Sequence, residues 1–265
     1  MKNYGFVRCA LGTFDGILCN PKVNALRIKE FISSAYDENA NILVLPELCL
    51  IGYTCQDLFE TTELLENSLE SLKDICNFSS EFAYKDILIL VGCPISANDS
   101  LYNCAVAICA GKVLGVVPKQ YIPNYNEFYE KRWFSPYSDN VSLTEIDIFK
   151  NGDKVPFGNL LFSSSLGYTL GVEICEDLWS VITPSSYMAL AEANIIANLS
   201  ASNELVGKND YRCELIKTQS ARTISAYLYV SSSGAFESSS DLVFGGSGYA
   251  FENGKQAWWL CCRNR

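Results

Sequence analysis

Continuous apolar runs, rather than alternating ones, constrain the fold of this chain most strongly. Residues 41–45 read NILVL and residues 86–92 read DILILVG. A strand that is apolar at every position must be buried on both faces, as in a sheet that is covered on both sides. Apolar residues at helical spacing precede each run, over 24–40 and 62–78. The pattern therefore predicts amphipathic helices that alternate with fully buried strands.

Hairpin signals interrupt this alternation. Strands predicted at 102–108 and 113–117 flank an Ala-Gly-Lys turn, and a second pair, 160–164 and 168–174, flanks a Leu-Gly turn. A parallel sheet built only from βαβ units does not need hairpins. We therefore predict an α/β fold in which two mixed sheets lie between two layers of helices, an α-β-β-α sandwich.

The remaining predicted elements extend to the end of the chain without a linker or a repeat. They are an opening strand at 6–11, helices at 186–193 and 210–226, strands at 195–199 and 227–231, and a last hairpin within 241–251. We predict one domain over 1–254. Residues 255–265 read KQAWWLCCRNR, a poor surface if exposed. We expect this tail to be atypical, non-native or disordered; a final strand that packs Trp258 and Trp259 is the alternative.

The net charge and the cysteine content limit the classes of partner and the cellular compartment that we expect for this protein. The formal net charge is −10, which disfavours nucleic acid and anionic membranes as partners. No apolar stretch approaches the roughly 20 residues that span a bilayer. The twelve cysteines form no C-x-x-C pair and follow no apolar leader. We expect reduced thiols in a cytoplasmic protein, most of them core residues, and no metal site.

The chain contains no histidine. Ser-His-Asp and Cys-His catalysis are therefore excluded. Any catalytic base that works near neutral pH must be Glu, Asp, Lys or Tyr.

Three candidate catalytic residues each follow directly on a predicted buried strand: Glu47 after NILVLP, Lys119 after VLGVVP and Cys175 after YTLGVEI. A free thiol has a pKa of about 8.5. A nearby ammonium lowers that pKa and a carboxylate accepts the proton. Lys119 and the backbone N–H of Glu176 would then stabilise an oxyanion. Glu47 would later activate water for hydrolysis.

Each candidate also has a structural interpretation. Glu47 follows a proline and would simply cap the next segment, and Lys119 would be one surface lysine among many. Cys175 is one of twelve cysteines, and its neighbours Glu173 and Glu176 would raise the pKa of its thiol.

Three strings around these residues resemble the motifs of the nitrilase superfamily of carbon–nitrogen hydrolases. They are PELCLIGY (46–53), PKQYIPNYNEFYEKRWF (118–134) and GVEICEDLW (171–179). The resemblance implies a nitrilase-like fold and the catalytic set Glu47, Lys119 and Cys175. It also places a second glutamate of the family, eight residues after the lysine, at Glu127, where it would hold the lysine and the substrate.

Further strings are similar to the N-terminal glutaminase domains of glutamine-dependent NAD synthetases. Among them are GYTCQDLF (52–59) and NLSASNE (198–204). This resemblance implies hydrolysis of L-glutamine through a cysteine thioester. The implied substrate-binding positions are Tyr125, Glu127, Glu176, Ser202 and Lys208. Lys208 is often an arginine in the family.

The same resemblance implies the partners. The ammonia would pass to a C-terminal NAD synthetase domain, which this sequence does not contain, and ATP and magnesium are expected only for that domain. We expect no cofactor for the domain described by this sequence, and a homo-oligomeric assembly. Two alternatives stay open: a stand-alone nitrilase-type amidase or carbamoylase on another small amide, and an inactive scaffold domain.

Overall fold

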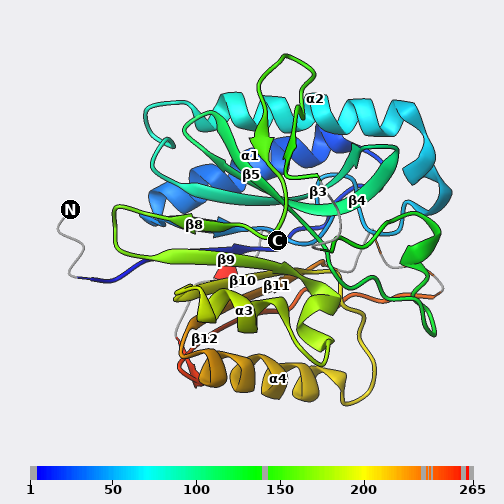
Figure 1. The fold of residues 1–265 in the computed structure, drawn as a ribbon. Helices are drawn as coiled ribbons and strands as arrows, with labels where there is room; N and C mark the ends of the chain where they lie inside the picture. The colour runs from blue at the N-terminus through cyan, green and yellow to red at the C-terminus, as the bar shows by residue number, and fades with distance from the viewer. Residues whose placement is uncertain are drawn as a thin grey trace.

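Two six-stranded sheets lie face to face between two layers of helices (Figure 1). This arrangement comes from a computed structural model, which describes residues 5–138, 143–233, 237, 239, 241–257 and 261–262. The predicted α-β-β-α sandwich of mixed sheets is confirmed.

The first sheet has the strand order β14-β1-β2-β3-β4-β5. Its strands are β1 (Cys9–Gly12), β2 (Ile42–Val44), β3 (Leu88–Ala97), β4 (Ser100–Cys109), β5 (Lys112–Pro118) and β14 (Cys261–Cys262). Strands β14, β1, β2 and β3 pair in parallel, and β3, β4 and β5 pair as antiparallel hairpins. Helices α1 (Pro21–Asp37) and α2 (Thr62–Ser79) cover its outer face.

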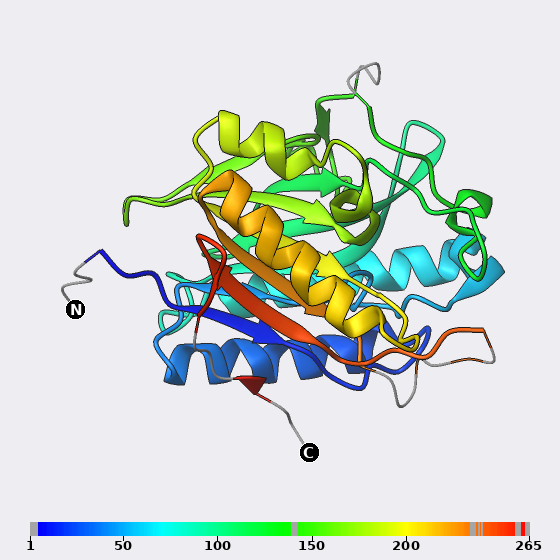
Figure 2. The ribbon, with the colours of Figure 1, turned by 90° about the horizontal axis from the view of Figure 1, so that it is seen from below.

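The second sheet has the order β13-β12-β11-β10-β9-β8. Its strands are β8 (Leu161–Ser163), β9 (Thr169–Ile174), β10 (Ile195–Ser200), β11 (Ala226–Ser231), β12 (Gly248–Glu252) and β13 (Lys255–Gln256). Helices α3 (Pro184–Leu190) and α4 (Lys208–Thr223) cover its outer face, and α4 runs along the strands in Figure 2. Short elements complete the structure: β6 (Glu145–Ile146), β7 (Val155–Pro156), and the 3-10 turns η1 (Gln56–Glu60), η2 (Glu130–Arg132) and η3 (Cys175–Trp179).

The alternation of side chains along β2 explains its continuous apolar run. Leu43 packs outward among the residues of α1 and α2. Ile42 and Val44 point the other way and pack against apolar residues of the second sheet. Because both faces of this strand are buried, every position must be apolar. The strand ends therefore emerge from a rigid core.

Both predicted hairpins, β4–β5 and β8–β9, are confirmed. A third hairpin, β3–β4, was not predicted, because the strand was expected to end at Gly92. It continues to Ala97 and turns at Asn98 and Asp99, both in the left-handed region that these residue types tolerate.

Parts of the tail pair with both sheets. Strand β13 pairs with β12, and Cys261 is the Cα partner of Leu11 in β1. Trp258 and Trp259 lie outside the described residues. None of the helices in the described part of the chain has the length and apolarity that crossing a bilayer requires.

Candidate active site

The three candidate catalytic residues lie at the ends of three buried strands. Glu47 follows β2 after two residues, Lys119 follows β5 directly, and Cys175 follows β9 directly. The first two side chains are fully buried and Cys175 is 6% exposed. The Lys119 Nζ lies 2.6 Å from Glu47 Oε1, and the charges of both residues act on the Cys175 thiol. The structure thus brings the three residues together.

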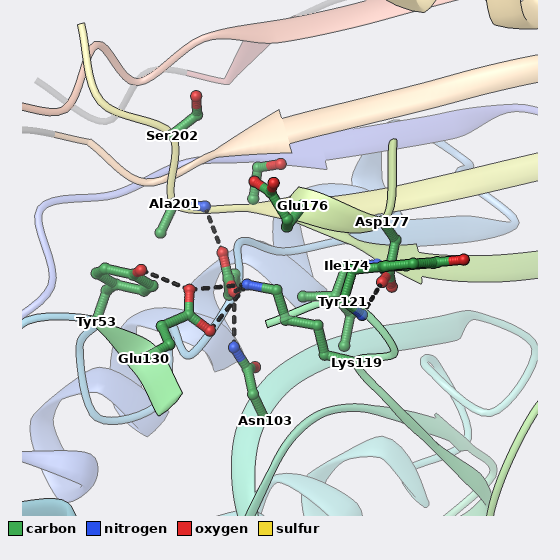
Figure 3. A network of polar contacts seen from close by, with 12 residues as sticks. Tyr53, Asn103, Lys119, Tyr121, Glu130, Ile174, Glu176, Asp177, Ala201 and Ser202 are labelled. Carbon is green, nitrogen blue, oxygen red and sulfur yellow. Dashed lines mark hydrogen bonds and ion pairs between the residues drawn. The ribbon is translucent and has the colours of Figure 1, made fainter. Parts of the chain in front are cut away.

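Glu47 is held from three sides. Its Oε1 accepts hydrogen bonds from Lys119 Nζ and from Asn103 Nδ2, both at 2.6 Å, and its Oε2 accepts one from the Ala201 backbone N–H at 2.8 Å. Figure 3 shows Asn103 and Ala201 approaching the same point from opposite sides. Three hydrogen-bond donors hold the Glu47 carboxylate in one orientation.

Gly92 makes room for the Glu47 turn. A Cβ atom at Gly92 would lie 2.3 Å from both the Pro46 carbonyl oxygen and the Leu48 backbone nitrogen. The chain next to Glu47 therefore packs directly on the backbone of β3, which only glycine permits.

Lys119 also forms an ion pair with a second buried carboxylate, that of Glu130. Its Nζ donates to Glu130 Oε1 at 2.8 Å and to Oε2 at 3.0 Å, and the Tyr53 hydroxyl donates to Glu130 Oε1 at 2.5 Å (Figure 3). Burial alone would lower the pKa of Lys119, but Glu130 and Glu47 outweigh it and raise the pKa. Lys119 is therefore an ammonium ion that two carboxylates share.

The carboxylate that holds the lysine is Glu130, where Glu127 was expected. Glu127 instead accepts a hydrogen bond from Asn203 Nδ2. Glu130 lies three residues further along the chain, where its N–H donates to the Pro123 carbonyl, and it is 2% exposed. The expectation that Glu127 contacts Lys119 is therefore wrong.

Cys175 lies at a sharp bend between β9 and η3, with a φ of +44°. This left-handed conformation is costly for a residue with a Cβ atom. Such strained residues cluster at functional sites, where the surrounding structure holds them in place.

The pKa of the Cys175 thiol is raised, by burial first and then by Glu47, while Lys119 and the Ala201 N–H oppose the shift. Lys119 lowers this pKa as expected, but burial and the carboxylates outweigh it, so the net shift is upward. One ammonium faces two carboxylates here, so a thiolate would add a further uncompensated negative charge. The thiol keeps its proton at rest, and attack requires a base beside it.

Asp177 connects the loop that follows Lys119 to the bend at Cys175. Its Oδ1 accepts hydrogen bonds from the backbone N–H groups of Gln120 at 3.1 Å and Tyr121 at 2.8 Å, and its Oδ2 accepts one from Ile174 at 2.9 Å. These donors adjoin Lys119 and Cys175 in the sequence. Asp177 is 1% exposed, so it fixes the two loops relative to each other.

Asp177→Asn is expected to loosen this connection. All three partners are donors, so the new amide NH2 group must face at least one N–H. The cost in the free energy of unfolding is about 1–3 kcal/mol, and misplacement of the catalytic groups is expected to lower kcat on the order of 10²-fold. Denaturant unfolding and steady-state kinetics measure the two effects. Asp153→Asn, at an exposed position, is the control; equal behaviour of the two variants would contradict this role.

Charged and aromatic residues surround the approach to Cys175. The Tyr125 hydroxyl donates to both oxygens of Glu176, at 3.1 and 3.0 Å. The Lys208 ammonium donates to Asn203 Oδ1 and lies over the rings of Phe128 and Trp179, 5.5 and 5.4 Å from their centroids. Burial lowers the pKa of Lys208, while Cys175, Glu127 and Glu176 oppose that shift.

Ser202 lies next to Ala201 and is 2% exposed (Figure 3). Its backbone N–H donates to Ser231 Oγ at 3.0 Å. Of the five predicted substrate-binding residues, Tyr125, Glu127 and Ser202 thus come from loops, Glu176 from η3 and Lys208 from the first turn of α4.

Several residues of this site were not predicted. One feature of the sequence could have identified Asn103. It is an amide inside the largely apolar strand β4, where burial of an unpaired polar group costs free energy. Tyr53 and Glu130 lie within the recognised motifs but were not singled out. Among the described residues, no group of three acidic, cysteine or histidine side chains has the arrangement of a metal site.

Comparisons with known proteins identify the family and the fold. Glutamine-dependent NAD(+) synthetase of Mycobacterium bovis is 37% identical over 254 residues, which are 95% of this chain and 36% of that protein. The enzyme of the same name from Rattus norvegicus is 30% identical over 80% of this chain and 29% of its own length. The chain therefore spans about a third of the length of these relatives.

Solved structures show the same fold. The glutamine-dependent NAD(+) synthetase of Cytophaga hutchinsonii matches with a TM-score of 0.83 and 28% identity, over 95% of this chain and 40% of that one. A mutant of an amidase from Nesterenkonia, of the nitrilase superfamily, matches with a TM-score of 0.76 and 17% identity, over 97% and 87% of the two chains. The sequence model of the carbon–nitrogen hydrolase family matches residues 11–253. The chain belongs to the carbon–nitrogen hydrolase family of enzymes.

Proposed function

We propose that this chain hydrolyses the side-chain amide of L-glutamine through a covalent thioester at Cys175. The observation that carries the proposal is the buried network of Glu47, Lys119 and Glu130 beside a protonated thiol. A base, a fixed cation and a nucleophile close together are the parts that amide hydrolysis requires.

The steps follow from the contacts. The Cys175 sulfur attacks the amide carbon while Glu47 takes the thiol proton. Lys119 and a backbone N–H at the bend stabilise the negative oxygen of the tetrahedral intermediate. Glu47 returns the proton to the departing nitrogen, and ammonia leaves a thioester. Glu47 then removes a proton from water, which attacks the thioester carbon; glutamate is released and Cys175 recovers its proton.

The charges around the bend favour glutamine over simple amides. Glutamine carries a carboxylate and an ammonium group far from its reacting amide. Lys208 supplies a cation, and Glu127 and Glu176 supply anions, within electrostatic reach of one another. Tyr125 and Ser202 complete the surroundings. A short aliphatic amide has neither charge and gains nothing from these groups, so it should bind more weakly than glutamine.

Lys208→Met is expected to raise KM for glutamine by about 10- to 100-fold, the value of a lost hydrogen bond to a charged group. The kcat is expected to change much less, because Lys208 would bind the part of the substrate that does not react. Lys208→Arg should restore most of the affinity. The matched control is Lys217→Met on the same helix, where the lysine is exposed and pairs with Glu214. An unchanged KM in Lys208→Met would remove Lys208 from the site.

The relatives suggest where the ammonia goes. They are named as glutamine-dependent NAD(+) synthetases and are about three times longer than this chain. We infer that a C-terminal synthetase domain, which uses ATP and magnesium, receives the ammonia.

The direct test compares substrates at equal concentration: glutamine, short aliphatic amides and N-carbamoyl compounds. The expected result is glutamate and ammonia from glutamine, with kcat/KM well above that for the other substrates. Preference for an aliphatic amide or a carbamoyl compound would instead support a stand-alone amidase or carbamoylase. No turnover of any of them would support an inactive scaffold.

A further inference from the structure

Two thiols away from the Cys175 bend lie close to each other. They belong to Cys19 and Cys55, which are 36 positions apart in the sequence, and each thiol shifts the pKa of the other. The same carbonyl group anchors both residues: the Cys19 backbone N–H donates to the Ile51 oxygen at 2.7 Å, and the Cys55 thiol donates to it at 3.2 Å. The backbone of Cys19 and the thiol of Cys55 are therefore held next to the same carbonyl group.

The two thiols differ in exposure. Cys19 is partly exposed, in the loop between β1 and α1, whereas Cys55 is 2% exposed. The hydrogen bond from Cys55 lowers the pKa of Cys19, and burial opposes that shift. The same hydrogen bond, and then burial, raise the pKa of Cys55.

Cys19 is distinct among the ten cysteines whose side chains the structure describes. The pKa of each of the other nine thiols is raised, in most of them by burial first. An accessible thiol of low pKa next to a second, buried thiol is the arrangement typical of oxidisable cysteine pairs.

We propose that Cys19 and Cys55 are a second reactive site of this protein, a dithiol that hydrogen peroxide converts to a reversible disulfide. The Cys19 thiolate attacks one peroxide oxygen, the O–O bond breaks, and Cys19 becomes a sulfenic acid as the released hydroxide takes a proton. The Cys55 sulfur then attacks the Cys19 sulfur. The S–S bond forms, the S–O bond breaks, and water leaves with the Cys55 proton. Two thiols and one peroxide give one disulfide and two waters.

The disulfide would act on the active site through Tyr53. The S–S bond is about 2.05 Å long, much shorter than a non-bonded contact between sulfurs, so its formation pulls the loop of Cys19 and the segment 51–55 together. Tyr53 lies in that segment, and its hydroxyl holds Glu130, the partner of Lys119. Its backbone N–H also donates to the buried Glu237. Oxidation should therefore weaken the hydrogen bond from Tyr53 to Glu130 and lower kcat.

The experiment treats the full chain with hydrogen peroxide and measures thiols and activity separately. The intact mass and the cross-linked peptides are determined on Cys175→Ala, so that the active-site thiol does not contribute. The expected result is a loss of two hydrogens that maps to Cys19 and Cys55 and is reversed by dithiothreitol. Cys19→Ser and Cys55→Ser should not show it, whereas Cys213→Ser, which changes another partly exposed thiol, should.

Activity is measured on proteins that retain Cys175. In the otherwise unchanged protein, kcat for glutamine is expected to fall on the order of tenfold or more after oxidation, as for an ångström-scale displacement of a catalytic group, and to recover with dithiothreitol. Cys19→Ser should keep its activity under the same treatment. A disulfide that maps elsewhere, or none, would overturn the site. A disulfide between Cys19 and Cys55 with unchanged kcat would overturn its connection to Tyr53. Loss of activity in Cys19→Ser as well would assign the effect to Cys175.

Discussion

Replacing Glu47 with glutamine is expected to lower kcat for glutamine hydrolysis by about 10²- to 10⁴-fold, the contribution of a positioned general base. The thiol holds its proton at rest, so its attack depends on this carboxylate. The new side chain has nearly the same shape as Glu47 and can still accept a hydrogen bond from Lys119 or Asn103. The fold and the binding of the substrate glutamine should therefore persist. Steady-state kinetics, with circular dichroism to check the fold, provide the measurement.

The matched control is Glu173→Gln. Glu173 is also a buried carboxylate, two residues before Cys175, but it accepts from the Tyr227 hydroxyl and from the Ser185 N–H at 2.8 Å, away from Lys119. Its loss should leave kcat within about tenfold, because its partners are Tyr227 and Ser185 and it takes no part in the proton transfers. A Glu47→Gln enzyme with near-normal kcat, or an equal loss in both variants, would refute the role of Glu47 as base.

Lys119→Met should be damaging in two separable ways. It leaves Glu47 and Glu130 buried together without a cation, and breaking such a pair costs about 3–5 kcal/mol in the free energy of unfolding. It also removes the ammonium that would face the oxyanion, which should lower kcat by about 10²- to 10³-fold. Urea unfolding measures the first effect and steady-state kinetics the second.

The double variant Lys119→Met with Glu130→Gln separates these effects. It removes one of the two carboxylates, so much of the lost stability should return while activity stays low. If activity returned together with stability, Lys119 would be a structural residue only. If neither returned, repulsion between the two carboxylates would not be the cause of the lost stability.

The placement of Glu47, Lys119 and Cys175 after buried strands was predictable from the sequence, whereas the motifs that resemble the nitrilase superfamily singled the three out as a catalytic set. A continuous apolar run predicts a buried strand, and the residue that follows it is presented at the sheet edge. Glu130 was not predictable in this way. The path of the loop from 120 to 130 depends on the left-handed turn at Asn126, and a spacing of eight residues does not determine where such a loop points.

The electrostatics of Cys175 and the contact of Cys19 with Cys55 also lay beyond the sequence. The pKa of a thiol depends on how many charges face it, and only the structure places a second carboxylate, Glu130, beside Lys119. The two thiols come together because the loop after β1 packs on the segment after β2, a tertiary contact with no local signal.

The central claim, that Cys175 is the nucleophile, is tested most directly by mass spectrometry after exposure to a diazo-ketone analogue of glutamine. We expect one adduct per chain, at Cys175, because only a ligand held beside Glu47 and Lys119 meets an activated thiol there. Excess glutamine should prevent the adduct and Cys175→Ala should abolish it. A general alkylating agent should instead modify Cys19 first, as the accessible thiol with the lowered pKa. Analogue label spread over several cysteines, or unchanged in Cys175→Ala, would contradict the account.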